Sequence, residues 1–124
     1  MKLYDSGKKL TKDSLERFEK MLGKSLPSDY KDFMMKDNGG TPEEDLAFSF
    51  IDVTTNSTNN SDIRELFVFY EDEDNDNFDD IVRIYNSMVN ENLIPPFFLP
   101  IGDDSGGNPI CMNLSENEYG SVWF

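Results

Sequence analysis

Near the N-terminus, apolar residues recur at every third or fourth position, which is the spacing of one face of an amphipathic helix. The pattern predicts a first helix from Thr11 to Leu22. Asp13 and Glu16 resemble a capping box near its start, and Gly23 can adopt the left-handed conformation that ends a helix. Four residues should form its inward-facing stripe: Leu15, Phe18, Met21 and Leu22.

A second helix is expected to open at Pro27, because proline is favoured in the first turn of helices, where an acidic side chain such as Asp29 also stabilises the helix dipole. It should end at Asp37 to Gly40, since Asn and Gly accept the left-handed conformation. Its inward-facing residues should be Tyr30, Phe33, Met34 and Met35. Two consecutive helices could also form a helix-turn-helix that reads DNA, but packing of both against a sheet fits an acidic chain better.

Apolar runs predict two strands in the middle of the chain, at 46–53 and 66–70. The second run is apolar on both faces, so we expect it to be covered on both. Residues 54–62 between them are rich in Asn, Ser and Thr and are interpreted as a mobile loop. A third amphipathic helix should follow from about Asp79 to Asn90.

A pair of prolines, Pro95 and Pro96, breaks the chain before a predicted hairpin. The strands of this hairpin, at 97–101 and 110–114, flank a loop at 102–108. The loop consists of Gly, Asp, Ser and Asn, which tolerate turn conformations and bond their own backbone.

The last strand is expected at 120–124, and no repeat or linker divides the chain. The order of elements predicts one α+β domain over residues 1–124. In this fold, about three helices pack with a central, mostly antiparallel sheet of about five strands. Because the chain stops within a predicted strand, we expect a truncated or unusually short member of its class.

The net charge of −14 is distributed unevenly along the chain. Residues 1–40 hold nine Lys or Arg and seven Asp or Glu, whereas residues 41–124 hold two and eighteen. Such a surface repels nucleic acid, which is bound by neutralising its phosphates with Lys and Arg. It attracts a basic protein and speeds the encounter with it. We therefore expect a protein partner and no nucleic acid.

No apolar run approaches the ~20 residues that span a bilayer, and the N-terminus lacks the apolar core of a signal peptide. A cytoplasmic protein without membrane attachment is therefore expected. The single cysteine, Cys111, lies between Ile110 and Met112 and is interpreted as a buried thiol.

The predicted hairpin loop contains Gly-Asp-Asp-Ser-Gly-Gly, which is similar to the nucleophile region of trypsin-like serine proteases. Ser105 would be the nucleophile, but the chain has no histidine to accept its proton. A hydrolase that uses the carboxylates of Asp103 and Asp104 is an alternative. Adjacent side chains on a strand point to opposite faces, although a loop could bring them together. We expect no enzyme, no catalytic residue and no cofactor.

The densest acidic segment, residues 71–80, invites comparison with a calcium-binding EF-hand loop. Acids stand at positions one, three, five and nine of such a loop: Asp72, Asp74, Asp76 and Asp80. Asn77 replaces the glycine of position six, and Arg83 replaces the bidentate glutamate of position twelve. We therefore expect no metal. A solvated acidic loop and a contact surface for a basic partner remain open.

Several short motifs stand in a characteristic order along nearly the whole chain. Their residues are Leu26, Pro27, Tyr30, Asn38, Gly39, Gly40, Pro100, Gly102, Gly106, Gly107 and Trp123. This series resembles the SUKH superfamily, which is named in part for a fungal cell-wall-assembly regulator and is abundant in bacteria. We interpret these residues as structural, because a helix end or a turn accounts for the asparagine and the glycines. The family's pattern normally continues beyond the last aromatic strand, which leaves any binding element built there in doubt.

The resemblance implies an α+β fold with a central sheet and no known catalytic machinery. It implies that the protein is an immunity protein that binds and neutralises a polymorphic toxin, often a nuclease, or alternatively an intracellular interaction or regulatory module. An acidic surface suits the first function, since a nuclease site is basic. The candidate partner-binding residues are Glu71, Asp72, Glu73, Asp74, Asp76, Asp79, Asp80, Asp103 and Asp104.

Overall fold

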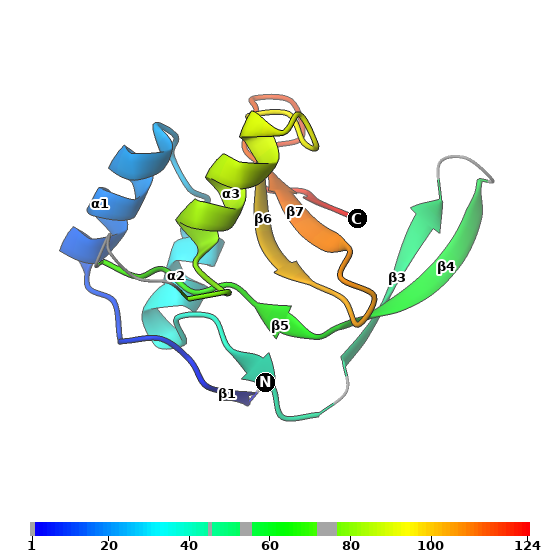
Figure 1. Ribbon diagram of the computed structural model, residues 1–124, viewed down its shortest axis with the longest axis horizontal. Helices are drawn as coiled ribbons and strands as arrows, with labels where there is room; N and C mark the ends of the chain where they lie inside the picture. The colour runs from blue at the N-terminus through cyan, green and yellow to red at the C-terminus, as the bar shows by residue number, and fades with distance from the viewer. Residues whose placement is uncertain (1, 45, 53–55, 72–76) are drawn as a thin grey trace.

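The computed structural model describes residues 2–44, 46–52, 56–71 and 77–124. Its largest sheet has four antiparallel strands in the order β5-β6-β7-β8. These strands are β5 (Glu65–Leu66), β6 (Phe98–Asp103), β7 (Pro109–Asn113) and β8 (Val122–Trp123). Helix α3 (Ile81–Asn90) packs across one face of this sheet and contacts β6 (Figure 1).

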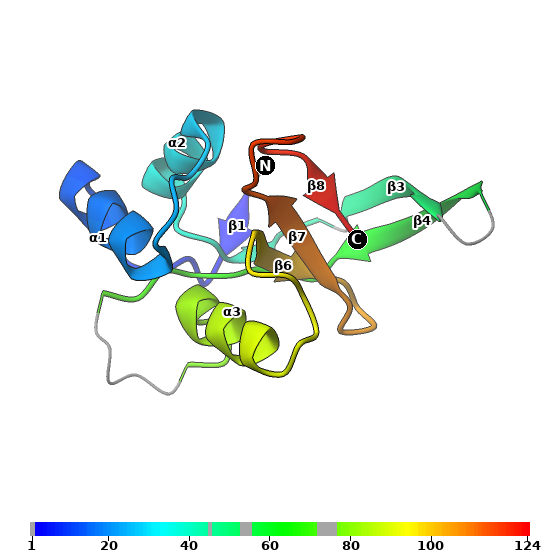
Figure 2. The same ribbon diagram turned by 90° about the horizontal axis from the view of Figure 1, so that it is seen from above.

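Two further helices, α1 (Lys12–Leu22) and α2 (Ser28–Lys36), lie next to each other at one end of the molecule. A two-stranded arm, β3 (Leu46–Asp52) with β4 (Ser57–Ile63), extends from the opposite end, as Figure 2 shows. The remaining pair, β1 (Leu3–Tyr4) with β2 (Thr41–Pro42), adjoins β5 through a bridge between Gly40 and Leu66.

The predicted α+β class is confirmed. The described part of the chain has three helices, and its named strands pair antiparallel in sheets of four, two and two. The core lies between the helices and the four-stranded sheet, where Phe18 of α1 stacks on Phe69 with ring centroids 4.5 Å apart. Its buried members are Leu10, Leu15, Phe18, Leu22, Leu26, Tyr30, Met34, Phe67, Phe69, Ile81, Val82, Tyr85, Leu99 and Met112.

The first helix is confirmed to within one residue of its predicted bounds, but its cap differs from the prediction. Its N-cap is Thr11, whose side chain accepts a hydrogen bond from the Ser14 backbone, while the Ser14 hydroxyl accepts one from the Thr11 backbone. The capping box predicted at Asp13 and Glu16 is therefore wrong, because Asp13 already lies inside the first turn. The predicted end is confirmed at Gly23, where φ is 69°. Met21, predicted to face inward, is 41% exposed.

Residues 57–62, predicted as part of a mobile loop, form with Ile63 the second strand of the arm. Every residue of this strand pairs with one of β3, from Leu46 with Ile63 to Asp52 with Ser57. The arm stands away from the core (Figure 2), so β4 needs no alternation of apolar residues. Residues 53–55, the end of the predicted strand and the start of the predicted loop, lie outside the described residues.

The predicted strand at 66–70 is only partly regular. Its centre, Phe67 to Phe69, is buried as predicted, but just its first residue belongs to the ladder of β5. The Phe67 amide donates to the Ile101 carbonyl, and the Val68 amide donates to the Asp79 carbonyl. The backbone amides of Phe67 and Val68 are therefore hydrogen-bonded to two separate parts of the chain, not to one neighbouring strand.

The later elements agree with the sequence pattern. Helix α3 begins after Asp80, its N-cap, and the hairpin of β6 and β7 follows the two prolines. The last predicted strand is confirmed, although β8 is short. Cys111 is buried in β7, as expected, and burial raises the pKa of its thiol to about 11. No helix of the described segments is long and apolar enough to cross a membrane.

Candidate functional site

The acidic residues proposed from the sequence occupy different environments. Glu71 is exposed, Asp79 is half-buried, and Asp80, Asp103 and Asp104 are buried. The other four candidates lie outside the described residues: Asp72, Glu73, Asp74 and Asp76. Asp80, Asp103 and Asp104 each bond to other groups of the fold and so have a structural role.

Asp80 caps helix α3. Its carboxylate accepts hydrogen bonds from the amides of Val82 at 3.0 Å and Arg83 at 3.3 Å. These amides have no partner inside the helix, so an N-cap carboxylate satisfies them and favours the helix dipole.

Glu71 links the chain just after the segment Phe67 to Phe69 to the start of α1. Its carboxylate accepts hydrogen bonds from the Ser14 hydroxyl and from Arg17, the latter at 2.7 Å. The hydrogen bond from Ser14, followed by that from Arg17, lowers the pKa of Glu71.

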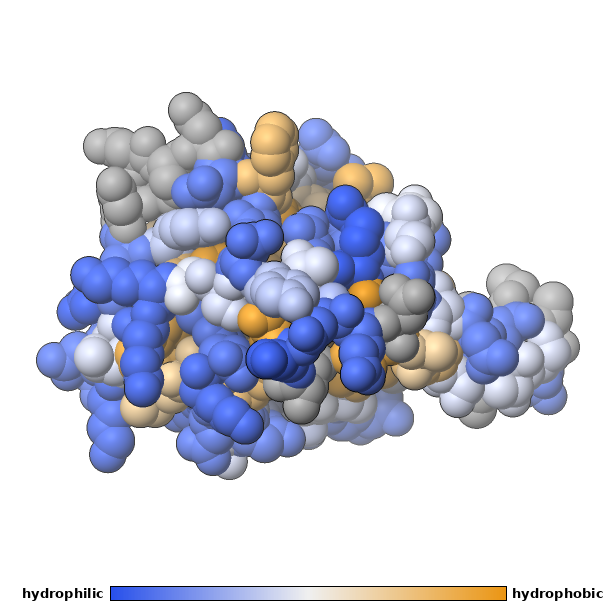
Figure 3. Space-filling view, turned by 90° about the horizontal axis from the view of Figure 1, so that it is seen from below, coloured by the Kyte–Doolittle hydropathy of each residue, from blue (hydrophilic) through white to orange (hydrophobic). Residues whose placement is uncertain are grey.

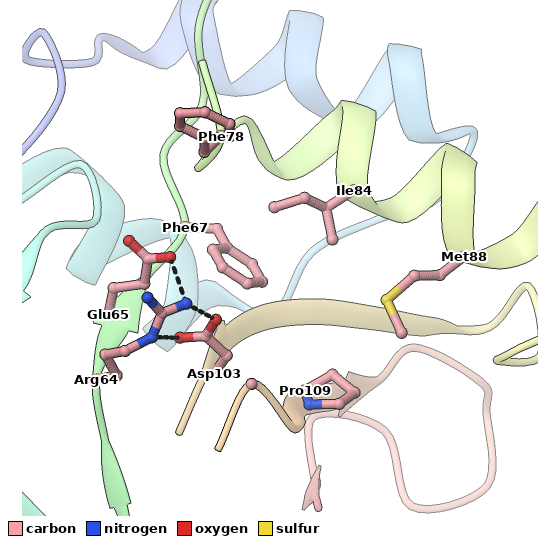
Figure 4. A pocket seen from close by; sticks show the side chains of 9 residues that line it. Arg64, Glu65, Phe67, Phe78, Ile84, Met88, Asp103 and Pro109 are labelled. Atoms are coloured by element: carbon pink, nitrogen blue, oxygen red, sulfur yellow. Dashed lines mark hydrogen bonds and ion pairs between the residues drawn. The ribbon is translucent and has the colours of Figure 1, made fainter. Parts of the chain in front are cut away.

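Arg64, which precedes β5, forms an ion-pair cluster with Asp103 and Glu65. It binds Asp103 through two hydrogen bonds, one from Nε to Oδ1 at 3.2 Å and one from Nη2 to Oδ2. The same Nη2 donates to Oε1 of Glu65 at 3.3 Å (Figure 4). The hydrogen bonds to Asp103 are the largest cause of the raised pKa of Arg64.

Glu65 carries its charge at a cost. Burial is the largest cause of its raised pKa, and the charges of Asp103 and Asp79 add to the increase, while Arg64 opposes it. The carboxylate of Glu65 is therefore less well compensated than that of an exposed glutamate.

Asp104 organises the hairpin loop. Its carboxylate accepts hydrogen bonds from the amides of Gly106 and Asn108, at 3.0 and 2.8 Å, and from the Ser61 hydroxyl at 2.8 Å. Burial would raise its pKa, but hydrogen bonds from Asn108, Ser61 and Gly106 outweigh burial and lower it. Asp103 faces Arg64 instead, so the two aspartates do not converge on one site.

Ser105 also has a structural partner. Its hydroxyl and amide both donate to the carboxylate of Asp62 in β4, and these bonds lower the pKa of Asp62. Asp62 and Ser61 thereby tie the base of the arm to the hairpin loop.

A hollow of about 520 Å³ lies near the acidic residues, between α3, β5 and the start of β7 (Figure 4). We call it the Phe78 hollow. Its apolar lining comes from Phe67, Phe78, Ile84, Met88 and Pro109, and its polar edge comes from Arg64, Glu65 and Asp103. Phe78 is 96% exposed, which is unusual for a phenylalanine.

A second hollow of about 340 Å³, the Asp79 hollow, shares Phe78 and Glu65 with the first. Its further lining residues are Asp5, Gly40, Thr41, Tyr70, Asn77 and Asp79. The Tyr70 hydroxyl donates to Oδ1 of Asp79 at 2.7 Å. Viewed from below, the molecule is largely hydrophilic with small apolar patches (Figure 3).

Sequence reasoning missed Arg64, Glu65, Phe78 and Met88. Phe78 had a signal, because it is the one apolar residue in the acidic run 71–80. The others had none, since tertiary contacts alone bring them to the same hollow.

The motif residues occupy structural positions. Asn38 is buried and bonded to the backbones of Lys8 and Phe69. Gly39 has a φ of 67°, and a Cβ there would lie 2.4 Å from the Phe67 carbonyl oxygen, so the chain requires glycine. The Tyr30 hydroxyl is buried without a hydrogen-bond partner in the described structure, and burial raises its pKa.

The remaining motif residues lie at turns, in strands or in the core. Leu26, Pro27, Pro100 and Gly102 are buried. Gly106 and Gly107 lie in the hairpin loop, and the half-exposed Trp123 donates from Nε1 to the Ser121 hydroxyl at 2.8 Å. Among the described residues, no group of three or more Asp, Glu, Cys or His could hold a metal ion.

Three helices, antiparallel strands and a hollowed surface with an acidic edge define a small α+β protein with a candidate contact site. The chain belongs to the SMI1/KNR4 family (SUKH-1), whose family model matches residues 9–124. This match confirms the resemblance seen in the motifs.

One relative is the SPbeta prophage-derived uncharacterized protein YokK of Bacillus subtilis (strain 168). It is 28% identical over 118 residues, which cover 87% of this chain and 59% of the relative. The chain thus matches less than two thirds of the relative's length. No solved structure gives a significant match.

Proposed function

We propose that this protein is a non-enzymatic immunity protein that binds a cognate polymorphic toxin through its acidic surface and neutralises it. Membership of the SMI1/KNR4 family (SUKH-1) supports the proposal, because this family implies an immunity protein, or alternatively an interaction module. A toxin with a basic surface, above all a nuclease, is the partner that fits, since a site for phosphates must be positively charged.

The observation that carries the proposal is the shortage of cations beside the two hollows. Residues 41–124 contain only two basic residues, Arg64 and Arg83. Arg64 is already bound by Asp103 and Glu65, so its charge is largely neutralised within the protein. Among the described residues that line the two hollows, the four acids Asp5, Glu65, Asp79 and Asp103 outnumber the basic Arg64, so this surface attracts a basic partner and disfavours an acidic one.

Co-expression of this protein with its candidate toxin tests the proposed function in cells. The toxin domain is taken from the open reading frame next to this gene and expressed alone or together with the full chain. We expect growth arrest with the toxin alone and normal growth with both. Arrest that persists while soluble immunity protein accumulates would overturn the proposal.

A matched pair of variants tests the role of the surface. Glu65→Gln with Asp79→Asn removes two charges at the hollows, and Glu116→Gln with Glu118→Gln removes the same number of charges before β8, at the other edge of the sheet. The first pair should weaken toxin binding by about tenfold or more, and the second should change it by less than about threefold. Equal effects would show that only net charge matters.

A further inference from the structure

Phe78 and Glu65 line both hollows, so an apolar site and an acidic site lie side by side. Phe78 and Glu65 are 13 positions apart in the sequence, and both border the two hollows, Phe78 near the start of α3 and Glu65 beside Arg64 (Figure 4). A ligand that fills one hollow would therefore place its next group at the other.

The Phe78 hollow has the chemistry of an anchor pocket. Ile84 and Met88 stand one turn apart on α3 and form one wall, and Phe67 forms another (Figure 4). Its volume falls within the range of pockets that enclose small ligands. The methionine can adapt its shape to different bulky apolar groups.

The Asp79 hollow has the opposite character. Its lining includes the acidic residues Asp5, Glu65 and Asp79, and none of the lining residues that the structure describes is Lys or Arg. Hydrogen bonding from Tyr70 fixes the position of the Asp79 carboxylate. An ammonium or guanidinium group is the complement of such a hollow.

We propose that the two hollows form one anchor site, which takes a protein segment in which a bulky apolar side chain is adjacent to a lysine or arginine. The apolar side chain fills the Phe78 hollow beside Phe78 and Met88, and the cation lies against Glu65 and Asp79. The identity of the partner as a toxin rests on the proposed function, whereas the chemistry of the site does not.

Two further observations support this occupant. Phe78 exposes 96% of its surface, and aromatic residues beside a polar rim are typical of the centres of protein interfaces. The pKa of Glu65 is raised by burial and by the charges of Asp103 and Asp79, despite Arg64. An arriving cation would add to the compensation that Arg64 gives Glu65 in the unbound protein.

A titration without any toxin tests the site. The full chain, isotopically labelled, is titrated with two capped dipeptides, acetyl-Trp-Arg amide and acetyl-Trp-Glu amide, and backbone amide NMR shifts are followed. We expect Trp-Arg to bind with a Kd of about 1 mM and at least about tenfold more tightly than Trp-Glu. The largest shifts should occur at Phe67, Phe78 and Met88.

Three variants locate the binding. Phe78→Ala should weaken Trp-Arg binding at least about fivefold, and it should fold normally because Phe78 is exposed. Glu65→Gln should reduce the preference for Trp-Arg over Trp-Glu to less than about threefold. Leu93→Ala removes another exposed apolar side chain, beyond the end of α3, and should bind like the unmodified protein.

Equal binding of the two dipeptides, shifts confined to the surface around Trp123, or unchanged binding by Phe78→Ala would each overturn the anchor site. The toxin experiment fails independently. A protein that binds Trp-Arg at the hollows but does not protect cells would retain the anchor site and lose the proposed function. If Phe78→Ala and Glu65→Gln leave protection intact, the proposed function is retained and the anchor site is lost.

Discussion

At the scale of single residues, the side chain of Asn38 supplies backbone hydrogen bonds to the end of the segment Phe67 to Phe69, which lacks regular strand pairing. Its amide nitrogen donates to the carbonyls of Lys8 and Phe69, both at 2.9 Å, and its amide oxygen accepts from the Phe69 backbone at the same distance. The side chain is 2% exposed, so water cannot take over these hydrogen bonds. Asn38 thus joins the N-terminal segment at Lys8 to the buried segment at Phe69.

Asn38→Ala should therefore destabilise the fold strongly. Each buried polar group left without a partner costs roughly 1–3 kcal/mol, and the substitution affects two such groups of Phe69 and the partly buried Lys8 carbonyl, so we expect a loss of at least about 2 kcal/mol in the free energy of unfolding. Urea denaturation measures it. Asn60→Ala, on the exposed strand β4, is the matched control and should change stability by less than about 0.5 kcal/mol. Similar effects of both substitutions would contradict this role.

Glu65 should behave in the opposite way. Because its folded pKa is raised, the folded state disfavours its charged form, and the penalty exists at neutral pH and disappears as falling pH protonates the carboxylate. Arg64 opposes this penalty, and Asp103 and Asp79 increase it. Glu65→Gln should therefore raise the thermal midpoint at neutral pH, and the difference should close near about pH 4. A lower midpoint at neutral pH would mean that the ion pair with Arg64 outweighs burial.

At the scale of elements, segments with a periodic apolar pattern were predictable, including β3 of the arm, whereas a polar strand and an irregular buried segment were not. The inward stripes of α1 and α2 were found because Phe18, Tyr30 and Met34 are buried at helical spacing. Strand β4 was missed because its side chains are polar and its pairing with β3 uses the backbone, which leaves no periodic signal. The irregular course of Phe67 to Phe69 depends on partners far away in the sequence.

The junction between α1 and Glu71 depends on pH. The pKa of Glu71 is lowered by its bonds to Ser14 and Arg17, so its contribution is present at neutral pH and is lost as the pH falls through the folded pKa. Glu71→Gln should cost about 0.5 kcal/mol at neutral pH, a small effect because the pair is partly exposed. Unfolding curves should converge with those of the unmodified protein in acid. Glu16→Gln, at an exposed site on α1, is the matched control for the loss of one acidic charge.

At the scale of the whole molecule, charge is separated along the chain. Nine of the eleven basic residues precede residue 41, in the part that forms α1 and α2, and eighteen of the 25 acidic residues follow. The sequence alone therefore predicted an acidic contact surface, but not where it is hollowed. Asp80, Asp103 and Asp104 were candidates for contact, yet the fold uses them as a cap, an ion-pair partner and a loop organiser.

The charge separation predicts a salt-dependent encounter with a basic partner. Steering by a field of one sign raises association rates and is screened by salt. The association rate should fall about tenfold between about 50 and about 500 mM salt, while dissociation changes less. Stopped-flow fluorescence with the purified toxin domain measures both rates. An association rate independent of salt would contradict steering by the acidic surface.

We propose that this protein neutralises a basic toxin by direct binding at the anchor site. A titration of the purified toxin domain with the full chain, read as residual toxin activity, tests it most directly. We expect activity to disappear when the two proteins are equimolar, and to persist when Phe78→Ala with Glu65→Gln replaces the unmodified chain. Full toxin activity in the presence of about a tenfold excess of the unmodified, folded protein would contradict the account.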